Sequence, residues 1–340
     1  MVGVIGAGSF GTTIAGLLAQ NCKVLIYTRD KTIADRINAH QQILGYTLPS
    51  KVRATSSPVE ICDKCKVLMP VLPSSSFRDI IKLFSPHLHP YHVIIHGTKG
   101  FDLIHVDLNH FYPQISKRNI RTMSTVITQE TQVVRVGCVS GPNLSAEIRK
   151  GLPAAAVVAS DFDEVITIGY HILNGEKFRI YGSHDLLGTE IAGALKNMIA
   201  VGTGMIAGLS LGKNVEALFI TRGLREMMLI GRALGADPKT FFGTAGVGDL
   251  IATTTSADSR NYSFGFQMAK GKSKLQIEQE SKQLTEGVRT IQLMHHFALN
   301  AKLDVPILEM LYSVIFRNLP LDKAMQYLLE YPYAIDVDYI

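Results

Sequence analysis

Residues 2–19 read VGVIGAGSFGTTIAGLLA, and this stretch decides the fold of the first half of the chain. Four apolar residues predict a short buried strand, and the run after the glycines predicts a helix. Between them, Gly6, Gly8 and Gly11 form G-x-G-x-x-G in the strand–turn–helix context of a dinucleotide-binding site. Gly6 permits the tight turn, Gly8 lets a pyrophosphate approach the backbone, and Gly11 lets the helix pack on the strand. A glycine-rich turn without a ligand is the weaker interpretation.

The second predicted strand, KVLIYT at residues 23–28, is followed by Arg29 and Asp30. An acidic residue at this point usually binds the ribose 2′-hydroxyl of NAD, whereas an arginine accommodates the 2′-phosphate of NADP. Because the arginine comes first, the sequence favours NADP modestly and leaves the use of both cofactors open. Alternatively, Arg29 could stack on the adenine or extend into solvent.

Strands and helices continue to alternate up to about residue 182. Further apolar strands are predicted at 66–72, 91–96, 133–139, 154–160 and 177–181. Two of them run into glycine turns, GTKG and SGPN, which place Lys99 and Gly141 at carboxyl ends of strands, where open α/β sheets bind ligands. A solvated loop is the alternative for Lys99. We therefore predict a Rossmann-type, doubly wound dinucleotide-binding domain over residues 1–182.

After residue 182 helical patterns replace the strands. They cover residues 190–209, 214–234, 287–300, 305–317 and 321–329. These patterns predict an all-α second domain over residues 183–340, to which the resemblance described below gives the substrate and catalytic role. Residues 243–265, rich in Gly, Ser and Thr, interrupt the helices and have the composition of a flexible linker. However, Asp249, Arg260 and Asn261 stand among apolar residues there, which favours an ordered segment.

Residues 188–206, GTEIAGALKNMIAVGTGMI, place a lysine in an apolar helix. From residue 191 to residue 206 only Lys196, Asn197 and Thr203 are polar. A helix without a polar face is normally buried, and a lysine is rarely buried without a partner or a function. The alternative is that the lysine extends to solvent from a helix end. We interpret Lys196 as a buried cation that faces a site and shares a helix face with Thr203.

Composition narrows the class of protein. With 46% hydrophobic and 19% charged residues, the 340-residue chain is an ordinary globular protein with room for two domains. The net charge of +5 comes without the dense basic runs of a nucleic-acid binder, and KGKSK at 270–274 is expected to be a solvated turn. The chain shows neither a signal-peptide pattern nor an uncharged 18-residue apolar run, so we expect a cytoplasmic protein without a membrane span.

The cysteines indicate free thiols. They stand at positions Cys22, Cys62, Cys65 and Cys138. The single C-x-x-C pair lacks the second pair, or the histidines at finger spacing, of a zinc site. Redox or metal use is the minor alternative, and no metal site is predicted. The tandem pair His295 and His296 is expected to be structural.

Seven stretches, in matching order over nearly the whole chain, together resemble NAD(P)-dependent glycerol-3-phosphate dehydrogenase of the bacterial type. They are GAGSFGTTIA, HGTKG, SGPNLSAE, EIAGALKN, KNVEALFITRGLREM, GVGDLIATTTSADSRN and TEGVRT. The first is shared by many enzymes, whereas the combination of EIAGALKN, GDLIATTT and SRN is specific. The resemblance implies reversible hydride transfer between NADPH or NADH and dihydroxyacetone phosphate, giving sn-glycerol 3-phosphate for glycerophospholipid synthesis.

The resemblance also implies roles for individual residues, with Lys196 as the catalytic acid and base. The residues implied to bind the triose phosphate are Lys99, Gly141, Asn143, Asp249, Thr253, Ser259, Arg260 and Asn261. Those implied to contact the dinucleotide, beside the three glycines, are Ser9, Phe10, Arg29, Lys99, Ser145, Arg260, Leu284 and Glu286.

The chain departs from the family pattern at several positions. Phe10 stands where Trp or Tyr is common, which should preserve an aromatic contact. Asn143 and Ser145 stand where Ser and Ala are usual, which weakens the inference for those two contacts. Ser75 replaces a usual His and is assigned no role, and Tyr262 replaces a usual Arg, which removes one positive charge.

The expected chemistry is proton transfer by Lys196. As hydride reaches the ketone, an ammonium group can stabilise the charge on the oxygen and deliver the proton. Arg260 is the natural anchor for the phosphate, because its planar fork pairs two oxygens. Two alternatives stay open, namely a sister hydroxyacid dehydrogenase for carboxylate or acyl-CoA substrates and a non-catalytic dinucleotide sensor. A homodimer is a further expectation, because helical second domains of this class commonly associate.

Overall fold

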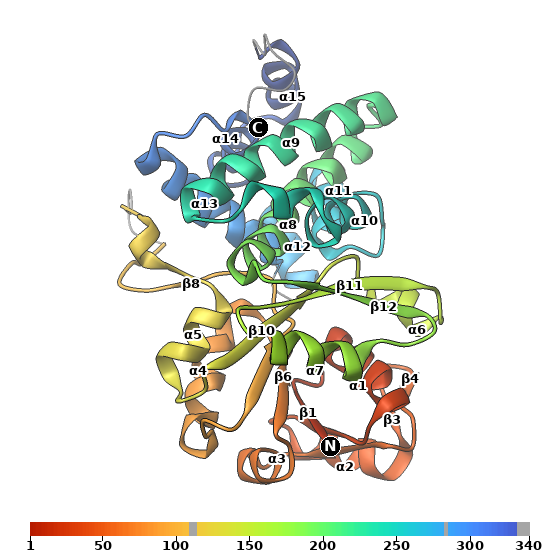
Figure 1. Ribbon diagram of the computed structural model, residues 1–340. Helices are drawn as coiled ribbons and strands as arrows, with labels where there is room; N and C mark the ends of the chain where they lie inside the picture. Colours follow the sequence, from red (N-terminus) through yellow and green to blue (C-terminus); the bar gives the residue numbers. More distant parts are fainter. Residues whose placement is uncertain (109–113, 282–284, 332–340) are drawn as a thin grey trace. The chain divides into compact units, whose positions relative to one another are not determined.

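The computed structural model describes residues 1–108, 114–281 and 285–331, and its contacts divide the chain into two units (Figure 1). Unit 1 comprises Met1–Asp102 and Thr122–Glu190. Unit 2 comprises Leu103–Arg121 and Ile191–Ile340. The chain therefore leaves unit 1 once and returns to it before the second unit is completed. No feature of the sequence signalled this excursion.

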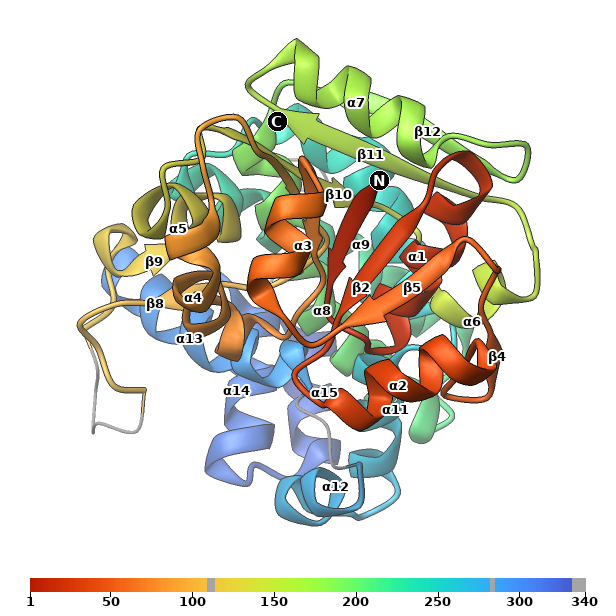
Figure 2. The same cartoon turned by 90° about the horizontal axis from the view of Figure 1, so that it is seen from below.

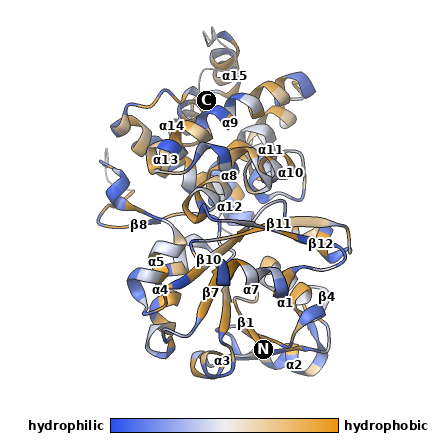
Figure 3. Cartoon of the chain, in the orientation of Figure 1, coloured by the Kyte–Doolittle hydropathy of each residue, from blue (hydrophilic) through white to orange (hydrophobic). Residues whose placement is uncertain are grey.

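Unit 1 is built on one sheet, which has eight strands in the described part of the chain. Their spatial order is β12 (Phe178–Ser183), β11 (Ala154–Ser160), β10 (Arg135–Ser140), β7 (Val93–His96), β6 (Val67–Pro70), β1 (Val2–Ile5), β2 (Val24–Tyr27) and β5 (Val52–Thr55). Neighbouring strands pair in parallel, except for the antiparallel pair of β10 and β11. The inner strands are apolar and buried on both faces, as a sheet covered by helices requires. Figure 3 shows them mainly in the hydrophobic colour.

The strand order reverses beside β1. The chain adds β2 and β5 on one side of β1 and then places β6, β7 and β10 on the other. Val2 accordingly pairs with Val24 of β2 and with Val67 of β6. In open α/β sheets, ligands bind at the carboxyl ends of the strands where the order reverses. This topology places the glycine loop after β1 at the ligand-binding edge.

Helices cover both faces of the sheet (Figure 2). The described α-helices of unit 1 are α1 (Ser9–Asn21), α2 (Lys31–His40), α3 (Pro58–Lys64), α4 (Ser74–Phe84), α5 (Met123–Glu130), α6 (Ser145–Arg149) and α7 (Asp163–Leu173). One hydrophobic cluster includes Ile14 of α1 and Leu173 of α7. A second cluster includes Ile61 of α3 and Phe77 of α4. Two helical layers around a largely parallel sheet confirm the predicted doubly wound fold.

The main part of unit 2, after residue 190, is helical, as predicted, whereas its first segment takes part in the two-stranded sheet of β8 (Asp102–Leu103) and β9 (Ile120–Arg121). Its described helices are α8 (Leu186–Gly208), α9 (Lys213–Leu234), α10 (Asp249–Thr254), α11 (Arg260–Ala269), α12 (Lys274–Ser281), α13 (Glu286–Ala301), α14 (Pro306–Arg317) and α15 (Leu321–Glu330). Helix α8 begins with residues of unit 1 and continues into unit 2. No strand occurs among the described residues after Ser183. Proline opens α14 at its first turn, where a missing N–H is tolerated.

Helix α8 is buried over almost its whole length. It is long and apolar enough to cross a bilayer, but 94% of its most apolar window is buried inside the protein. The helix is therefore a core element of the fold. Lys196 is only 6% exposed, which rules out the alternative in which its ammonium extends into solvent.

The segment at residues 243–265 is ordered, as the polar residues among its apolar ones indicated, and the flexible-linker alternative is excluded. A π-helical turn, Thr244–Gly248, leads into α10, and α11 follows. Helix α11 approaches α8 backbone to backbone, because a Cβ on Gly265 would lie 1.8 Å from the carbonyl oxygen of Val201. Glycine at this position thus lets the backbones of the two helices meet.

The cysteines are free thiols. Burial raises the pKa of Cys62 to about 12 and that of Cys65 to about 11. Because the thiolate is the reactive form, this pair is poorly suited to redox chemistry. Among the described residues, no group of three or more His, Cys, Asp or Glu side chains is placed to hold a metal ion.

We predict that Gly265→Ala destabilises the protein by about 2 kcal/mol or more, because the added methyl would collide with a helical carbonyl. Urea unfolding followed by circular dichroism measures this change. Gly243→Ala is the control, since its Cβ would meet its nearest atom, the Thr240 carbonyl oxygen, at an ordinary 3.4 Å. Equal unfolding midpoints for the two variants would contradict close α8–α11 packing.

Candidate functional site

In the loop after β1, backbone geometry and packing require glycine at positions Gly6 and Gly11 but not at Gly8. Gly6 has φ +122°, and a Cβ on Gly11 would lie 2.1 Å from the carbonyl oxygen of Gly6. A Cβ on Gly8 would meet nothing within 4 Å. Gly8 is also the N-cap residue of α1 and has no side chain to cap the helix, and the first turn of α1 has no acidic residue. The open space beside Gly8 and the uncapped helix start fit an anionic ligand such as a pyrophosphate.

Arg29 and Asp30 follow the end of β2, and only the Asp30 carboxylate is engaged in a helix cap. Asp30 caps α2 by accepting hydrogen bonds from the backbone N–H of Thr32 at 2.8 Å and from its hydroxyl at 2.6 Å. These bonds hold the pKa of Asp30 below its usual value. Arg29 is exposed. Asp30 is exposed as well, but the carboxylate that would bind a ribose 2′-hydroxyl in an NAD site is engaged by its own helix.

The loop after β7 carries Lys99 and is fastened to three neighbouring elements. The Thr98 hydroxyl donates to the carbonyl oxygen of Leu72 at 2.8 Å. The Lys99 ammonium donates to the carbonyl oxygen of Gly141 at 2.9 Å, after β10. A Cβ on Gly97 would lie 3.1 Å from the Phe10 ring, so the aromatic residue of the glycine loop packs directly on this loop. Unit 1 thereby brings together the predicted residues of three loops at one edge of its sheet.

Glu190 binds the residue at the start of this loop, and it is not among the residues predicted from the sequence. Its carboxylate accepts hydrogen bonds from His96 Nε2 at 2.9 Å, from the backbone N–H of Ser124 at 2.9 Å and from the Ser124 hydroxyl at 2.5 Å. Both Glu190 and His96 are buried. A buried carboxylate at the edge of an apolar helix gives the same sequence signal as Lys196, and Glu190 directly precedes the apolar run 191–206. Its partners lie 66 and 94 residues away in the sequence, so the local pattern could not identify them.

The loop after β10 presents polar atoms that have no partner in the described part of the chain. Both amide atoms of Asn143 and the hydroxyl of Ser140 are buried without a hydrogen bond. Gly141, with φ +132°, turns the chain between them. Buried polar groups are normally hydrogen-bonded, so these atoms are donors and acceptors available to a polar ligand. Ser145 follows as the first residue of α6.

In unit 2, Lys196 is paired and buried. Its ammonium donates to Asp249 Oδ1 at 2.8 Å and to the hydroxyl of Thr253. The side chains of Lys196 and Asp249 are 7% and 2% exposed. Thr253 follows Asp249 by one helical turn on α10, so both acceptors approach the ammonium from one helix. Thr203 bonds instead to carbonyl oxygens of its own helix.

The Ser-Arg-Asn stretch starts α11. Ser259 caps the helix by accepting from the N–H of Tyr262 at 3.3 Å. Arg260 is exposed at the first helical position. The amide of Asn261 donates to Asn197 at 2.8 Å and accepts from the N–H of Gly287 at 2.9 Å, so it fastens the residue beside Lys196. Among the cofactor predictions in this unit, Glu286 is half-buried at the start of α13, and Leu284 lies outside the described residues.

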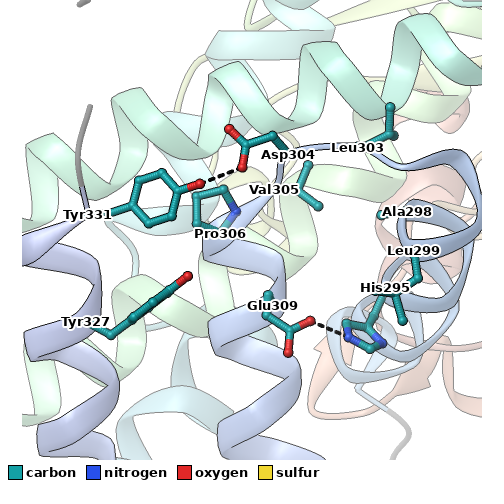
Figure 4. A pocket seen from close by; sticks show the side chains of 10 residues that line it. All are labelled: His295, Ala298, Leu299, Leu303, Asp304, Val305, Pro306, Glu309, Tyr327 and Tyr331. Atoms are coloured by element: carbon teal, nitrogen blue, oxygen red, sulfur yellow. Dashed lines mark hydrogen bonds and ion pairs between the residues drawn. The ribbon is translucent and has the colours of Figure 1, made fainter. Parts of the chain in front are cut away.

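A pocket of about 220 Å³ in unit 2 lies among α13, α14 and α15 and is lined by none of the predicted site residues (Figure 4). At its wall, His295 Nε2 lies 2.5 Å from Glu309. The His295 ring stacks on Tyr312 with 3.6 Å between ring centroids. These contacts give the His295–His296 pair the structural role that its sequence position suggested.

Comparison with known proteins agrees with this arrangement. A family model described as the NAD-dependent glycerol-3-phosphate dehydrogenase N-terminus matches residues 1–166. A second, described as the C-terminus of the same family, matches residues 185–326. The two matches together cover most of the chain, including every region that carries a predicted site residue.

Individual relatives show the same similarity over nearly the full length. A Saccharophagus degradans protein named glycerol-3-phosphate dehydrogenase, NAD(P)+, is 37% identical over 342 residues, covering 99% of this chain and 92% of the relative. Its namesake from Acinetobacter baylyi is 36% identical, covering 100% and 92%. The crystal structure of glycerol-3-phosphate dehydrogenase from Coxiella burnetii superposes with a TM-score of 0.86 at 29% identity, covering 97% of this chain and 98% of that one.

We predict that Gly8→Ala leaves the thermal midpoint of the unliganded protein unchanged but weakens NADPH binding at least about tenfold, ~1.4 kcal/mol. The methyl would occupy only the open space in which a pyrophosphate would lie. Gly11→Ala should lower the thermal midpoint itself, because its methyl meets the backbone of Gly6. Thermal unfolding and titration of NADPH fluorescence separate the two effects, and full NADPH affinity in the Gly8 variant would contradict the assignment.

Proposed function

The chain belongs to the NAD-dependent glycerol-3-phosphate dehydrogenase family and is an oxidoreductase, and we propose how its residues carry out that family's reaction. The reaction is reversible reduction of dihydroxyacetone phosphate to sn-glycerol 3-phosphate with NADPH or NADH. Family membership supports the activity and the substrate class. The observation that carries the mechanism is the buried Lys196 ammonium with its two acceptors on α10.

Lys196 is the proton donor in this proposal. As the carbonyl carbon is reduced, negative charge develops on its oxygen, and a dry ammonium group both stabilises that charge and transfers a proton to it. In the reverse direction the neutral amine accepts the hydroxyl proton. Asp249 keeps the group protonated and oriented through a charge-assisted bond, and Thr253 fixes a second N–H direction. The bound nicotinamide ring supplies or accepts the hydride.

Each unit contains residues proposed to bind oxygens of the triose phosphate. In unit 1, the Lys99 ammonium, the backbone at Gly141 and the unpartnered amide of Asn143 are suited to its oxygens. In unit 2, Arg260 adds a planar guanidinium to the start of a helix, a combination that favours phosphate. Ser259 caps α11, and Asn261 binds Asn197 of α8. Contacts of these two residues with the substrate would therefore be additional to these structural roles.

The dinucleotide would bind along the glycine loop of unit 1. The open space at Gly8 and the uncapped start of α1 suit its pyrophosphate. Phe10, packed on Gly97, offers an aromatic face, and Ser9 and Ser145 open the adjacent helices. Contacts from Lys99, Arg260, Leu284 and Glu286 rest on family resemblance. Because Asp30 is engaged as a cap and Arg29 is exposed, the preferred cofactor is NADPH.

The wider role follows from family membership. We propose that the product supplies glycerophospholipid synthesis in the cytoplasm and that the enzyme is a homodimer. The functional division is proposed at residues 182 and 183, with the dinucleotide on the first part and the catalytic lysine on the second.

We predict that Lys196→Ala lowers kcat for dihydroxyacetone phosphate by about 10³-fold or more, since it removes the proton donor and a charge stabiliser. NADPH affinity should stay within about twofold, because a proton donor acts on the transition state rather than on cofactor binding. The decrease in absorbance at 340 nm measures turnover. Thr203→Val, on the same face of α8, is the control and should retain activity. Unchanged turnover in the Lys196 variant would refute its role, and wild-type activity only with 2-keto acids would favour a sister dehydrogenase.

We predict that Arg29→Ala lowers kcat/KM for NADPH by about tenfold, ~1.4 kcal/mol, and leaves that for NADH nearly unchanged. The guanidinium is expected to pair only with the 2′-phosphate. Arg36→Ala removes an exposed arginine from the neighbouring helix α2 and serves as the control. A parallel loss with both cofactors would show that Arg29 does not discriminate between them.

A further inference from the structure

Arg149 is a cation that has no role in the proposed mechanism and is not among the predicted site residues. It is the last residue of α6, yet its side chain binds the first turn of α1. Its Nε donates to the Thr13 hydroxyl at 2.8 Å, and a terminal nitrogen donates to the carbonyl oxygen of Ser9 at 2.5 Å and to the Thr12 hydroxyl at 2.7 Å. The guanidinium carbon lies 5.1 Å from the centre of the Tyr46 ring. Three hydrogen bonds and an aromatic contact hold it in place.

These contacts join two loops of the same unit. Helix α1 follows the glycine loop, and α6 follows the loop that contains Gly141 and Asn143. Arg149 therefore fixes the helix at the end of one ligand-binding loop to the helix at the end of the other. A displacement of α6 would change the position of Ser9, the residue directly after Gly8.

The charge of Arg149 is not explained by these contacts, because its acceptors are two hydroxyls and a carbonyl oxygen, all of them neutral. In the described part of the chain, no carboxylate lies within ion-pair distance of its guanidinium. Burial also lowers the pKa of Arg149, since desolvation disfavours its charged form. The first turn of α1 already carries positive charge on its free N–H groups and has no acidic residue. A cation beside it is unfavourable until an anion binds.

We propose that Arg149 is a further determinant of dinucleotide binding, which holds the first turn of α1 in place and adds positive charge that the phosphates of the cofactor compensate. This inference rests on the proposal that the glycine loop binds the dinucleotide. Arg149 acts on the cofactor's phosphates and leaves the triose and the proton-transfer step unaffected.

The test compares Arg149→Gln, which keeps two N–H donors but removes the charge, with Arg149→Lys, which keeps the charge. At low ionic strength, Arg149→Gln should raise the Kd for NADPH about tenfold, and the difference should shrink near 1 M salt, where the screening length is about 3 Å. Arg149→Lys should recover most of the affinity. The kcat and the KM for dihydroxyacetone phosphate should stay within about twofold of wild type, because the cation does not act on the reacting atoms. Arg179→Gln removes an exposed arginine of β12 in the same unit and controls for net charge.

The thermal midpoint of the unliganded protein distinguishes a charge effect from a purely structural role. If the charge opposes the start of α1, Arg149→Gln should have a midpoint equal to or above that of wild type. Equal NADPH affinity in wild type and Arg149→Gln would overturn the proposal. So would a salt-independent loss shared by Gln and Lys with lowered midpoints, since Arg149 would then only join α6 to α1. Wild-type protein that reduces dihydroxyacetone phosphate without measurable loss of affinity in Gly8→Ala would instead refute the glycine-loop assignment.

Discussion

The buried ion pair of Lys196 and Asp249 constrains how residues 243–265 fold against α8 in unit 2. Lys196 lies on a helix that is apolar on every side, so its charge is stable there only with a partner. Asp249 and Thr253 meet that requirement, and they can do so only because residues 243–265 fold into a π turn and two helices. Removing one partner of a buried ion pair costs about 3–5 kcal/mol, which explains why a segment with linker-like composition is nonetheless ordered.

A buried carboxylate has a comparable role in unit 1. Glu190, on the first part of the same helix, accepts hydrogen bonds from the end of β7 and the start of α5. The loop that carries Lys99 begins directly after His96, so this carboxylate fixes the point at which the loop departs from the sheet. Two charged residues of α8 thus act in different units. Glu190 anchors a ligand-binding loop of unit 1, and Lys196 of unit 2 supplies the proposed proton.

The sequence predicted those features whose physical cause is local. The strand, glycines and helix of residues 2–19 specify a nucleotide fold because Gly6 and Gly11 meet local steric demands and Gly8 leaves space for a ligand. The burial of Lys196 follows from the apolar residues on all sides of its helix. The short elements β5, α3 and α5 were missed, because neither a four-residue strand nor a helix of about two turns displays a clear hydrophobic periodicity. Contacts between distant residues were also missed. Glu190 with His96, Asn261 with Asn197, and Arg149 with Ser9 are set by the tertiary fold, and nothing beside these residues in the sequence identifies their partners.

The most direct test of the central claim is a crystal structure of the enzyme with dinucleotide and dihydroxyacetone phosphate bound together. The account predicts that the Lys196 ammonium lies within hydrogen-bond distance, about 2.6–3.2 Å, of the carbonyl oxygen of the triose, with Asp249 still bound to its opposite side. A complex in which another side chain or a water molecule donates to that oxygen, with Lys196 beyond reach, would contradict it.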